Sequence, residues 1–307
     1  MGFFRKLKSI KNINWKQVKE NLYYLSEVDL RTKEQDLIFQ IKDETIEECV
    51  LEFAMRKEQL RQLRVLDAQQ TIQLLRDHPR SFTRYGDGEI HVMQGKNQPF
   101  QRYDPRLAEK LLGTLSVKRE DVYVGLNHAY WEPPTRYAER NQRFYRINGT
   151  GYRRFFSKYC DPSATYLDAA CFGVYYRFDD TFDYDGHYQR VKNLFAGKKV
   201  AIIAGEGVIE KLDFDVFELA QHKMVIHGPR IDAFSEYERL MDKIDSTVPK
   251  DYLLCLILGQ TATAMVPDLT DLGYMAWDVG HMAKDYDAYM NHKEKTEKNM
   301  DAFWNPD

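Results

Sequence analysis

Short apolar runs alternate with amphipathic stretches over most of the chain. From residue 81 onward, runs of branched and aromatic residues predict strands, at 81–84, 122–126, 165–167, 200–204, 224–227, 253–258 and 275–277. Apolar residues at helical spacing predict helices between them, at 105–118, 135–158, 234–244 and 261–272. Such alternation is typical of a mostly parallel sheet flanked by helices, so the sequence predicts a Rossmann-like α/β fold.

The first 80 residues follow a different pattern. Residues 30–77 hold no glycine or proline and are rich in good helix formers, which predicts helices at 43–64 and 67–77. Ahead of them, apolar residues alternate with lysines at helical spacing. We therefore expect a helical N-terminal extension over 1–78 with a basic amphipathic tip at 1–27, an α/β domain over 79–292 and a tail over 293–307.

Charge is unevenly distributed along the chain. Its 307 residues include 44 Lys and Arg against 47 Asp and Glu, a net −3, yet residues 1–19 carry +6 and so leave −9 for the remainder. An acidic body argues against nucleic acid as the main partner, because phosphate contacts need a basic face. The basic tip is suited either to an anionic membrane surface or to docking on the body or a partner chain.

Several features indicate a cytoplasmic protein, with peripheral contact to the inner membrane face left open. No apolar run reaches the roughly 18–20 residues that cross a bilayer. The N-terminus lacks the long apolar segment of a secretory signal. The cysteines Cys49, Cys160, Cys171 and Cys255 have no metal-binding or redox spacing, which is typical of buried thiols in a reducing compartment.

Candidate chemistry follows the predicted strands, because ligands of open α/β sheets bind beyond the carboxyl ends of the strands. The first such segment runs from Arg84 through Gly86 and Asp87 to Glu89. Its Asp-x-Glu spacing can aim two carboxylates at one divalent cation, and Arg84 can contact a phosphate. The alternative is an ordinary turn in which Arg84 pairs with Glu89.

Two further segments suit a nucleotide. Gly205 and Glu206 follow the predicted strand at 200–204 and resemble a phosphate- or ribose-binding turn, although a complete GxGxxG is missing. After the apolar run at 253–258 come four small or polar residues that open a helix: Gly259, Gln260, Thr261 and Thr263. Anion binding and ordinary N-capping explain these residues equally well.

The last predicted strand is followed by Asp278 and His281, which are candidates for acid–base work or phosphate binding. A loop histidine bonded to backbone is the alternative for His281. No GxSxG, HExxH or P-loop pattern is present.

Together these segments resemble the bacterial glycosyltransferases of the GT-D fold, once known as the domain of unknown function 1792. The resemblance covers about residues 81–289 and rests on RYGDGEI, FQRYDPRLAEKL, VGL, HGPRIDAFSEYERLM and LILGQTATAMVPDLTDLGYMAWDVGH. It implies a Rossmann-like domain that transfers a sugar from a nucleotide donor, often UDP-glucose, to surface glycans or adhesin proteins. It also implies that Asp87 and Glu89 form the DxE pair, which serves Mn²⁺ or Mg²⁺ and the donor diphosphate.

The leading hypothesis is therefore a metal-assisted glycosyltransferase with a glycan, glycolipid or glycoprotein acceptor. An inverting reaction would need a general base, and the candidates are His281, Asp278, Asp285 and Glu206. Two other classes stay open: a non-catalytic nucleotide-sugar-binding subunit of another transferase, and a metal-dependent nucleotide-sugar hydrolase. The oligomeric state, including a homo-oligomer, is also open.

Overall fold

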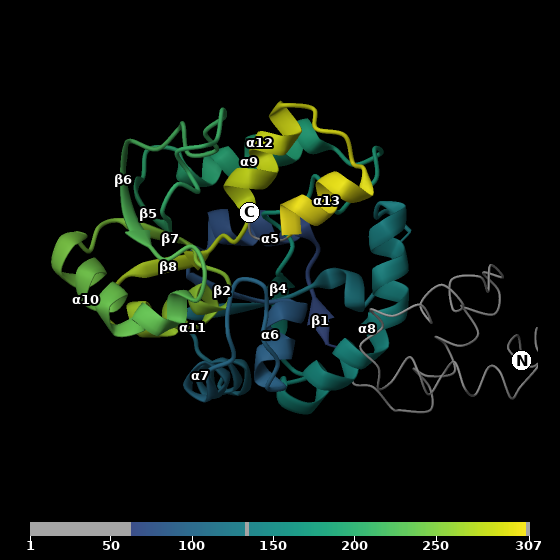
Figure 1. Cartoon of the computed structure of the whole chain (residues 1–307), viewed down its shortest axis with the longest axis horizontal. Helices are drawn as coiled ribbons and strands as arrows, with labels where there is room; N and C mark the ends of the chain where they lie inside the picture. Colours follow the sequence, from purple (N-terminus) through teal and green to yellow (C-terminus); the bar gives the residue numbers. More distant parts are fainter. Residues whose placement is uncertain (1–62, 133–134, 305–307) are drawn as a thin grey trace, which may run out of the picture.

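The computed structural model describes residues 63–132 and 135–304, and within them one sheet of eight parallel strands forms the centre of the molecule (Figure 1). The strand order is β1-β4-β3-β2-β8-β7-β5-β6. The strands are β1 (Arg64–Val65), β2 (Ser81–Tyr85), β3 (Val122–Leu126), β4 (Thr165–Asp168), β5 (Lys199–Gly205), β6 (His222–Gly228), β7 (Leu253–Ile257) and β8 (Met275–Asp278). The predicted α/β fold is confirmed, and each predicted strand is present within a few residues.

Helices cover both faces of this sheet. On one face α6, α7, α10 and α11 pack beside one another, and on the other α5 and α9 pack together near α12 (Figure 1). The α-helices are α5 (Ala68–Asp77), α6 (Asp87–Met93), α7 (Pro105–Ser116), α8 (Glu139–Tyr159), α9 (Tyr184–Phe195), α10 (Tyr237–Thr247), α11 (Gln260–Asp271), α12 (Met282–Met290) and α13 (Glu297–Trp304). Two short 3₁₀ helices, η1 (His128–Tyr130) and η2 (Ala233–Glu236), follow β3 and β6.

Local sequence explains where these elements begin. Asp67 and Gln70 form a reciprocal capping box at the start of α5, and Asp104 with Pro105 at the first turn opens α7. In β7 the first four residues are buried because helices cover both sides of this central strand. The helix expected at 234–244 begins as η2 and continues as α10, and the one expected at 135–158 begins later, at Glu139.

The helix expected at 43–64 is wrong at its last residue, because Arg64 belongs to β1 and pairs in parallel with Thr165 of β4. Leu63 is described and lies in no helix either, while residues 43–62 and the basic tip at 1–27 lie outside the described residues. Helix α5 packs on α9 and β4, so residues 64–77 already form part of the α/β body. The tail expected at 293–307 contains α13.

The neighbouring strands β2 and β8 mark the point where the topology of the sheet changes direction. Strands β2 and β8 are neighbours, with Phe82 opposite Trp277, yet the helices that follow them, α6 and α12, lie on opposite faces. The two chain segments therefore diverge beyond the strand ends, at the switch point of the topology. Ligands of such sheets bind there, so the residues after β2 and β8 are the first to inspect.

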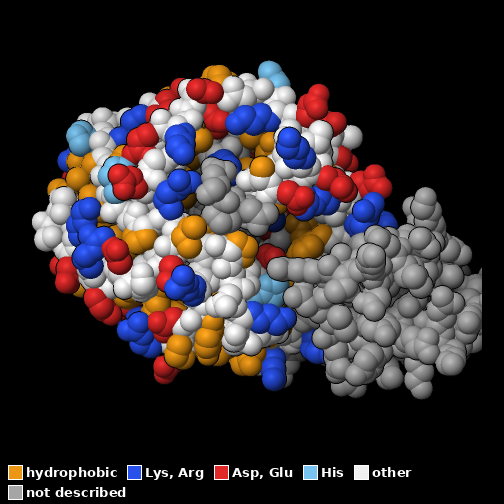
Figure 2. Space-filling view, viewed as in Figure 1, with side chains coloured by type: hydrophobic (Ala, Val, Ile, Leu, Met, Phe, Trp, Pro, Cys, Tyr) orange, Lys and Arg blue, Asp and Glu red, His pale blue; other side chains and the backbone are white. Residues whose placement is uncertain are grey.

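The surface gives little sign of a strongly charged or membrane-spanning protein. Figure 2 shows acidic and basic side chains interspersed over the face that it draws. Among the described helices, none combines the length and the apolar character that a bilayer crossing requires.

Candidate active site

An ion pair between neighbouring strands lies at the switch point. Arg84 of β2 donates from Nη2 to Asp278 Oδ1 of β8 over 2.9 Å, and from Nη1 to the Ala169 carbonyl over 2.7 Å. Asp278 also lies 3.1 Å from the Thr263 hydroxyl and accepts from the Gly280 N–H. Arg84 is thus held by Asp278, and the predicted alternative of a pair with Glu89 is not the one observed.

Gly280 shows how closely this pair is packed. A Cβ on Gly280 would lie 1.8 Å from Arg84 Nη2, and its φ of +49° is in the left-handed region. Only glycine meets both demands without strain, so the turn after β8 is shaped around the guanidinium.

The two carboxylates of the Asp-x-Glu segment lie in the first turn of α6. Gly86 is the N-cap, Asp87 the first helical residue, and Glu89 accepts from the Gly86 N–H over 2.7 Å. Negative charge is favoured at a helix N-terminus. Both residues are of intermediate exposure.

Glu89 has an unusual protonation equilibrium. Burial raises its pKa to about 7; the Gly86 N–H opposes that rise, and the nearby carboxylates of Asp278 and Asp87 add to it. Asp87, Glu89 and Asp278 therefore form an electrostatically coupled acidic group at the edge of the sheet. Such coupling is frequent at functional sites, where a cation or a proton relieves it.

No third ligand completes a metal cage in the part of the chain that the structure describes. Within it, no group of three or more His, Cys, Asp or Glu side chains is arranged to hold a metal ion. Two carboxylates still suit Mg²⁺ or Mn²⁺, since such ions usually keep several waters and substrate phosphates as ligands. The acidic group fits a cation shared with a substrate better than a resident structural metal.

Of the candidate residues after β7, Gln260 and Thr263 contact the site, whereas Thr261 contacts Gln101. Gln260 passes over the Asp-x-Glu segment, because a Cβ on Gly88 would lie 2.3 Å from Gln260 Nε2, and its Oε1 is buried without a hydrogen-bond partner. Thr263 joins the Asp278 network. Gly259 has a φ of +55°, and Thr261 is buried and donates to Gln101 instead.

The Gly205 turn stands apart from this cluster. A Cβ on Gly205 would meet Arg230 at 2.8 Å, so the turn packs against the segment after β6, and Glu206 is exposed. Because β7 separates β5 from β8, the turn lies about 10 Å along the sheet edge from Asp278, at roughly 4.8 Å per strand. Gly205 and Glu206 thus border a different stretch of the same edge.

His281 follows β8 and packs among aromatic rings. Its ring centre is 5.8 Å from that of Phe100, 5.2 Å from Phe303 and 5.4 Å from Trp304. Burial, together with the positive charges of Arg84, Lys284 and Arg177, lowers its pKa to about 3. His281 is therefore neutral at physiological pH and a weak base.

Asp285, a further candidate base, holds helix α12 in place through hydrogen bonds. Its Oδ2 accepts from the N–H groups of Val174 and Tyr175 at 2.7 and 2.9 Å and from the Tyr188 hydroxyl at 2.6 Å. These three donors tie α12 to the segment between β4 and α9 and to α9 itself.

No site residue is predicted from the sequence in the loop before α7, which packs at the carboxyl ends of the strands. Gln101 is buried, donates to Asp232 Oδ1 over 2.6 Å and accepts from the Phe234 N–H, while Phe100 lies against His281. Asp232 itself has a φ of +57°. The loop around Gln101 has no periodic apolar pattern. Only Asp232, which precedes the helix predicted at 234–244, stands out in the sequence at this contact.

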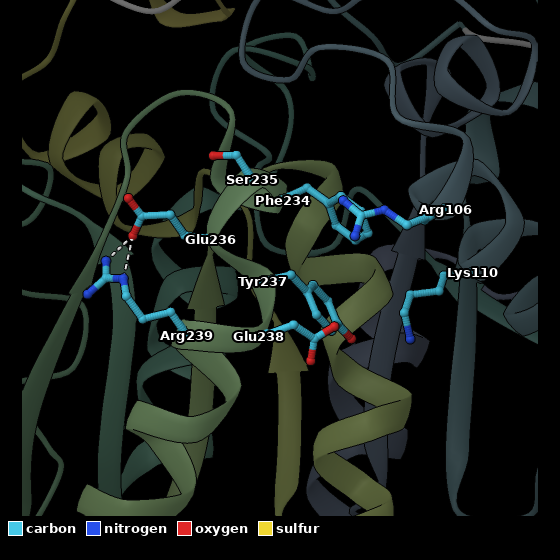
Figure 3. A pocket seen from close by; sticks show the side chains of 8 residues that line it. All are labelled: Arg106, Lys110, Phe234, Ser235, Glu236, Tyr237, Glu238 and Arg239. Atoms are coloured by element: carbon cyan, nitrogen blue, oxygen red, sulfur yellow. Dashed lines mark hydrogen bonds and ion pairs between the residues drawn. The ribbon is translucent and has the colours of Figure 1, made fainter.

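A hollow of about 370 Å³ opens between α7 and the start of α10, away from the acidic group (Figure 3). Its cations are neutralised: Lys110 pairs with Asp268, and Arg239 with Glu236. The rings of Phe234 and Tyr237 are buried in its wall. Arg106 likewise pairs with Asp104, so the hollow offers neither an unpaired cation nor an exposed ring to a ligand.

The fold and the site define a Rossmann-like α/β protein with an acidic, arginine-containing site at the switch point of a parallel sheet. Residues 82–303 match the family described as glycosyltransferase GT-D fold. The chain belongs to this family, and the resemblance inferred from the motifs is confirmed.

Two curated relatives support the assignment. The chain is 24% identical over 275 residues to a probable glycosyl transferase Gly of Streptococcus gordonii, and 26% identical over 249 residues to glycosyltransferase GlyD of Streptococcus pneumoniae. These alignments cover 84% and 78% of this chain but only 39% and 30% of the relatives. The chain thus spans less than half the length of either protein.

Solved structures agree with the fold. One, described as the domain of unknown function 1792 with a distinct glycosyltransferase fold, superposes with a TM-score of 0.72 at 26% identity, covering 83% of this chain and 94% of the other. A second, described as a new glycosyltransferase from Streptococcus sanguinis, gives a TM-score of 0.70 at 24% identity, covering 80% and 94%. The second likeness concerns the fold alone.

Proposed function

We propose that this chain transfers a hexose from a nucleoside-diphosphate sugar, with UDP-glucose the first donor to test, to a glycan, glycolipid or glycoprotein acceptor of the bacterial surface. The observation that carries the proposal is the acidic group of Asp87, Glu89 and Asp278 beside Arg84, at the switch point of a GT-D sheet. Relatives described as glycosyltransferases favour the same chemistry.

Asp87 and Glu89 are proposed to bind Mn²⁺ or Mg²⁺ together with the donor diphosphate. When bound, such an ion would stabilise negative charge on the departing nucleoside diphosphate. The raised pKa of Glu89 fits this role, because a cation replaces the proton that the crowded carboxylates otherwise hold.

Arg84 is proposed to place guanidinium N–H donors near the phosphates. Asp278 and the Ala169 carbonyl orient its guanidinium before any substrate arrives, which avoids a reorganisation cost during the reaction. Asp278 therefore acts through Arg84. His281 stays neutral and can accept a hydrogen bond from an acceptor hydroxyl.

We also propose a donor-binding role for Gly86, Gly259, Gln260, Thr261 and Thr263. The geometry supports this role more strongly for some of these residues than for others. Gln260 lies over the Asp-x-Glu segment and Thr263 reaches Asp278, so both are close to the proposed phosphates. Gly205 and Glu206 lie further along the edge, where a nucleoside extending from those phosphates would reach.

The remaining part of the proposal concerns location. Residues 1–27 are proposed to attach the protein peripherally to an anionic inner membrane face, because their lysines and apolar residues alternate at helical spacing. A lipid-linked acceptor would be presented at such a surface.

The test is turnover by the purified chain with a panel of nucleotide sugars and Mn²⁺ or Mg²⁺, with and without glycan acceptors, followed by release of nucleoside diphosphate. Asp87→Ala and Glu89→Ala should each lower kcat/KM by about a hundredfold or more while the melting temperature changes little. Glu109→Ala, at an exposed carboxylate of α7, is the matched control and should retain activity.

Near-normal activity of both variants at saturating metal would refute the metal site. Acceptor-independent release of sugar would indicate a hydrolase instead, and donor binding without turnover a non-catalytic subunit.

A further inference from the structure

A second arginine lies at the same edge of the sheet, but unlike Arg84 it is not neutralised. Arg177, between β4 and α9, donates from Nη1 to the Tyr145 hydroxyl over 3.2 Å, and its Nε is buried without a hydrogen-bond partner. It makes no ion pair within 4.0 Å among residues 63–132 and 135–304. A charged donor group is thus left unsatisfied, which is costly in a partly buried position.

The nearest carboxyl groups do not compensate this charge directly. Asp168 and Asp285 act on Arg177 only over a longer range, and each already accepts backbone N–H groups. Burial raises the pKa of both carboxyls. Arg84 offers the contrast, since Asp278 contacts it at 2.9 Å.

Arg177 is close to the proposed chemistry. Its charge contributes to the lowered pKa of His281, and Arg177 and Asp87 both act on Tyr130, whose pKa burial raises. In the strand order, Arg177 follows β4, which lies beyond β3 on one side of β2, whereas Gly205 ends β5 on the other side.

The guanidinium is also oriented in advance. Its carbon is 4.6 Å from the centre of the Trp304 ring, and Trp304 in turn packs on His281. Stacking on an aromatic face fixes the plane of an arginine and leaves its edge free to donate.

We propose that Arg177 is a phosphate-binding residue of the site, which donates from its free guanidinium edge to a phosphate or diphosphate of a substrate. The inference rests on the proposed transferase function and adds a second cationic contact to it. A planar fork suits the bidentate recognition of phosphate oxygens. The phosphate can belong to the donor diphosphate or to a phosphorylated acceptor, and the two sources are separable by titration.

Calorimetric titration tests the proposal with the full chain and two probes. The first probe is UDP with Mn²⁺, and the second is inorganic pyrophosphate added to UDP-saturated protein. Arg177→Gln should weaken one of them by about tenfold or more, as expected for loss of a charge-assisted hydrogen bond. A weaker first probe assigns the donor phosphates, and a weaker second probe assigns an acceptor phosphate.

Two further variants separate binding from folding. Arg177→Lys keeps the charge but loses the fork, so its affinity should lie between those of the wild type and Arg177→Gln. Arg190→Gln removes an arginine of α9 that is already paired with Asp183, and should leave both affinities unchanged. Melting temperatures establish that each variant is folded.

Unchanged affinity of folded Arg177→Gln or Arg177→Lys for both probes overturns the inference, as does a wild-type protein that binds neither probe. Turnover is scored separately. If no donor is consumed but Arg177→Gln still weakens a probe, the phosphate site stands and the transferase proposal fails; the reverse result removes only the phosphate site.

Discussion

At the scale of single residues, the candidate site is organised by polar groups that are only partly satisfied. Arg84 and Asp278 pair across two strands and burial raises the pKa of Glu89, while Arg84 Nε, Arg177 Nε and Gln260 Oε1 are buried without a hydrogen-bond partner. Buried polar groups are normally paired, so unpaired donors and acceptors beside a carboxyl with a raised pKa are typical of a binding site.

Glu89 gives a prediction in the absence of metal. Its folded-state pKa of about 7 lies above its ordinary value of 4.5, so the folded state favours the protonated form and the wild type loses stability as pH rises between these values. Glu89→Gln cannot ionise and keeps an oxygen for the Gly86 N–H. Its stability relative to wild type should therefore increase by about 1–2 kcal/mol from about pH 5 to about pH 8.

Urea unfolding in EDTA at both pH values measures this difference. A stability difference that is the same at the two pH values would show that Glu89 titrates normally.

At the scale of elements, the site depends on how helix α12 is fixed. Asp285 accepts from two N–H groups of the segment after β4, and Asp287 accepts from the Asp213 and Phe214 N–H groups. Two buried carboxylates two positions apart thus anchor α12 to two separate loops. The position of His281 at the start of α12 follows from these anchors.

Asp285→Ala should destabilise the protein by about 2–4 kcal/mol, because two backbone N–H groups and the Tyr188 hydroxyl lose their acceptor in a buried site. Asp242→Ala, at an exposed carboxylate of α10, should change stability by less than about 0.5 kcal/mol. Chemical unfolding of both variants measures the contrast. Equal effects would mean that Asp285 does not anchor α12.

Elements were predictable where the sequence itself records their environment. The run at 253–258 predicts β7 because a strand buried on both faces must be apolar, and Asp67 predicts α5 because it caps the helix. The contact of Gln101 with Asp232 joins residues 131 positions apart and leaves no periodic trace. Arg177 was missed for the same reason, since its neighbours come from α8 and α13.

At the scale of the whole molecule, the described residues account for the GT-D match. The proposed role of the basic tip at 1–27 needs a separate experiment. Full-length protein is expected to bind anionic liposomes at low salt and to dissociate near 0.5 M salt, about three times physiological, because screening weakens surface attraction. Protein lacking residues 1–19 should not bind. If the truncated protein co-sediments equally well, the proposed membrane contact is wrong, and the basic tip should be sought in a protein interface.

The pairing of β2 with β8 has a consequence for synthesis of the protein. Phe82 and Trp277 are partners in the sheet but are 195 residues apart in the chain. At about 5–20 residues per second, a ribosome exposes β2 roughly 10–40 seconds before β8 is made. During that interval one side of β2 has no partner and Arg84 has no Asp278, so the candidate site is among the last parts to assemble. An unpaired strand is prone to aggregate, so chaperones or temporary pairing would protect β2 until β8 is made.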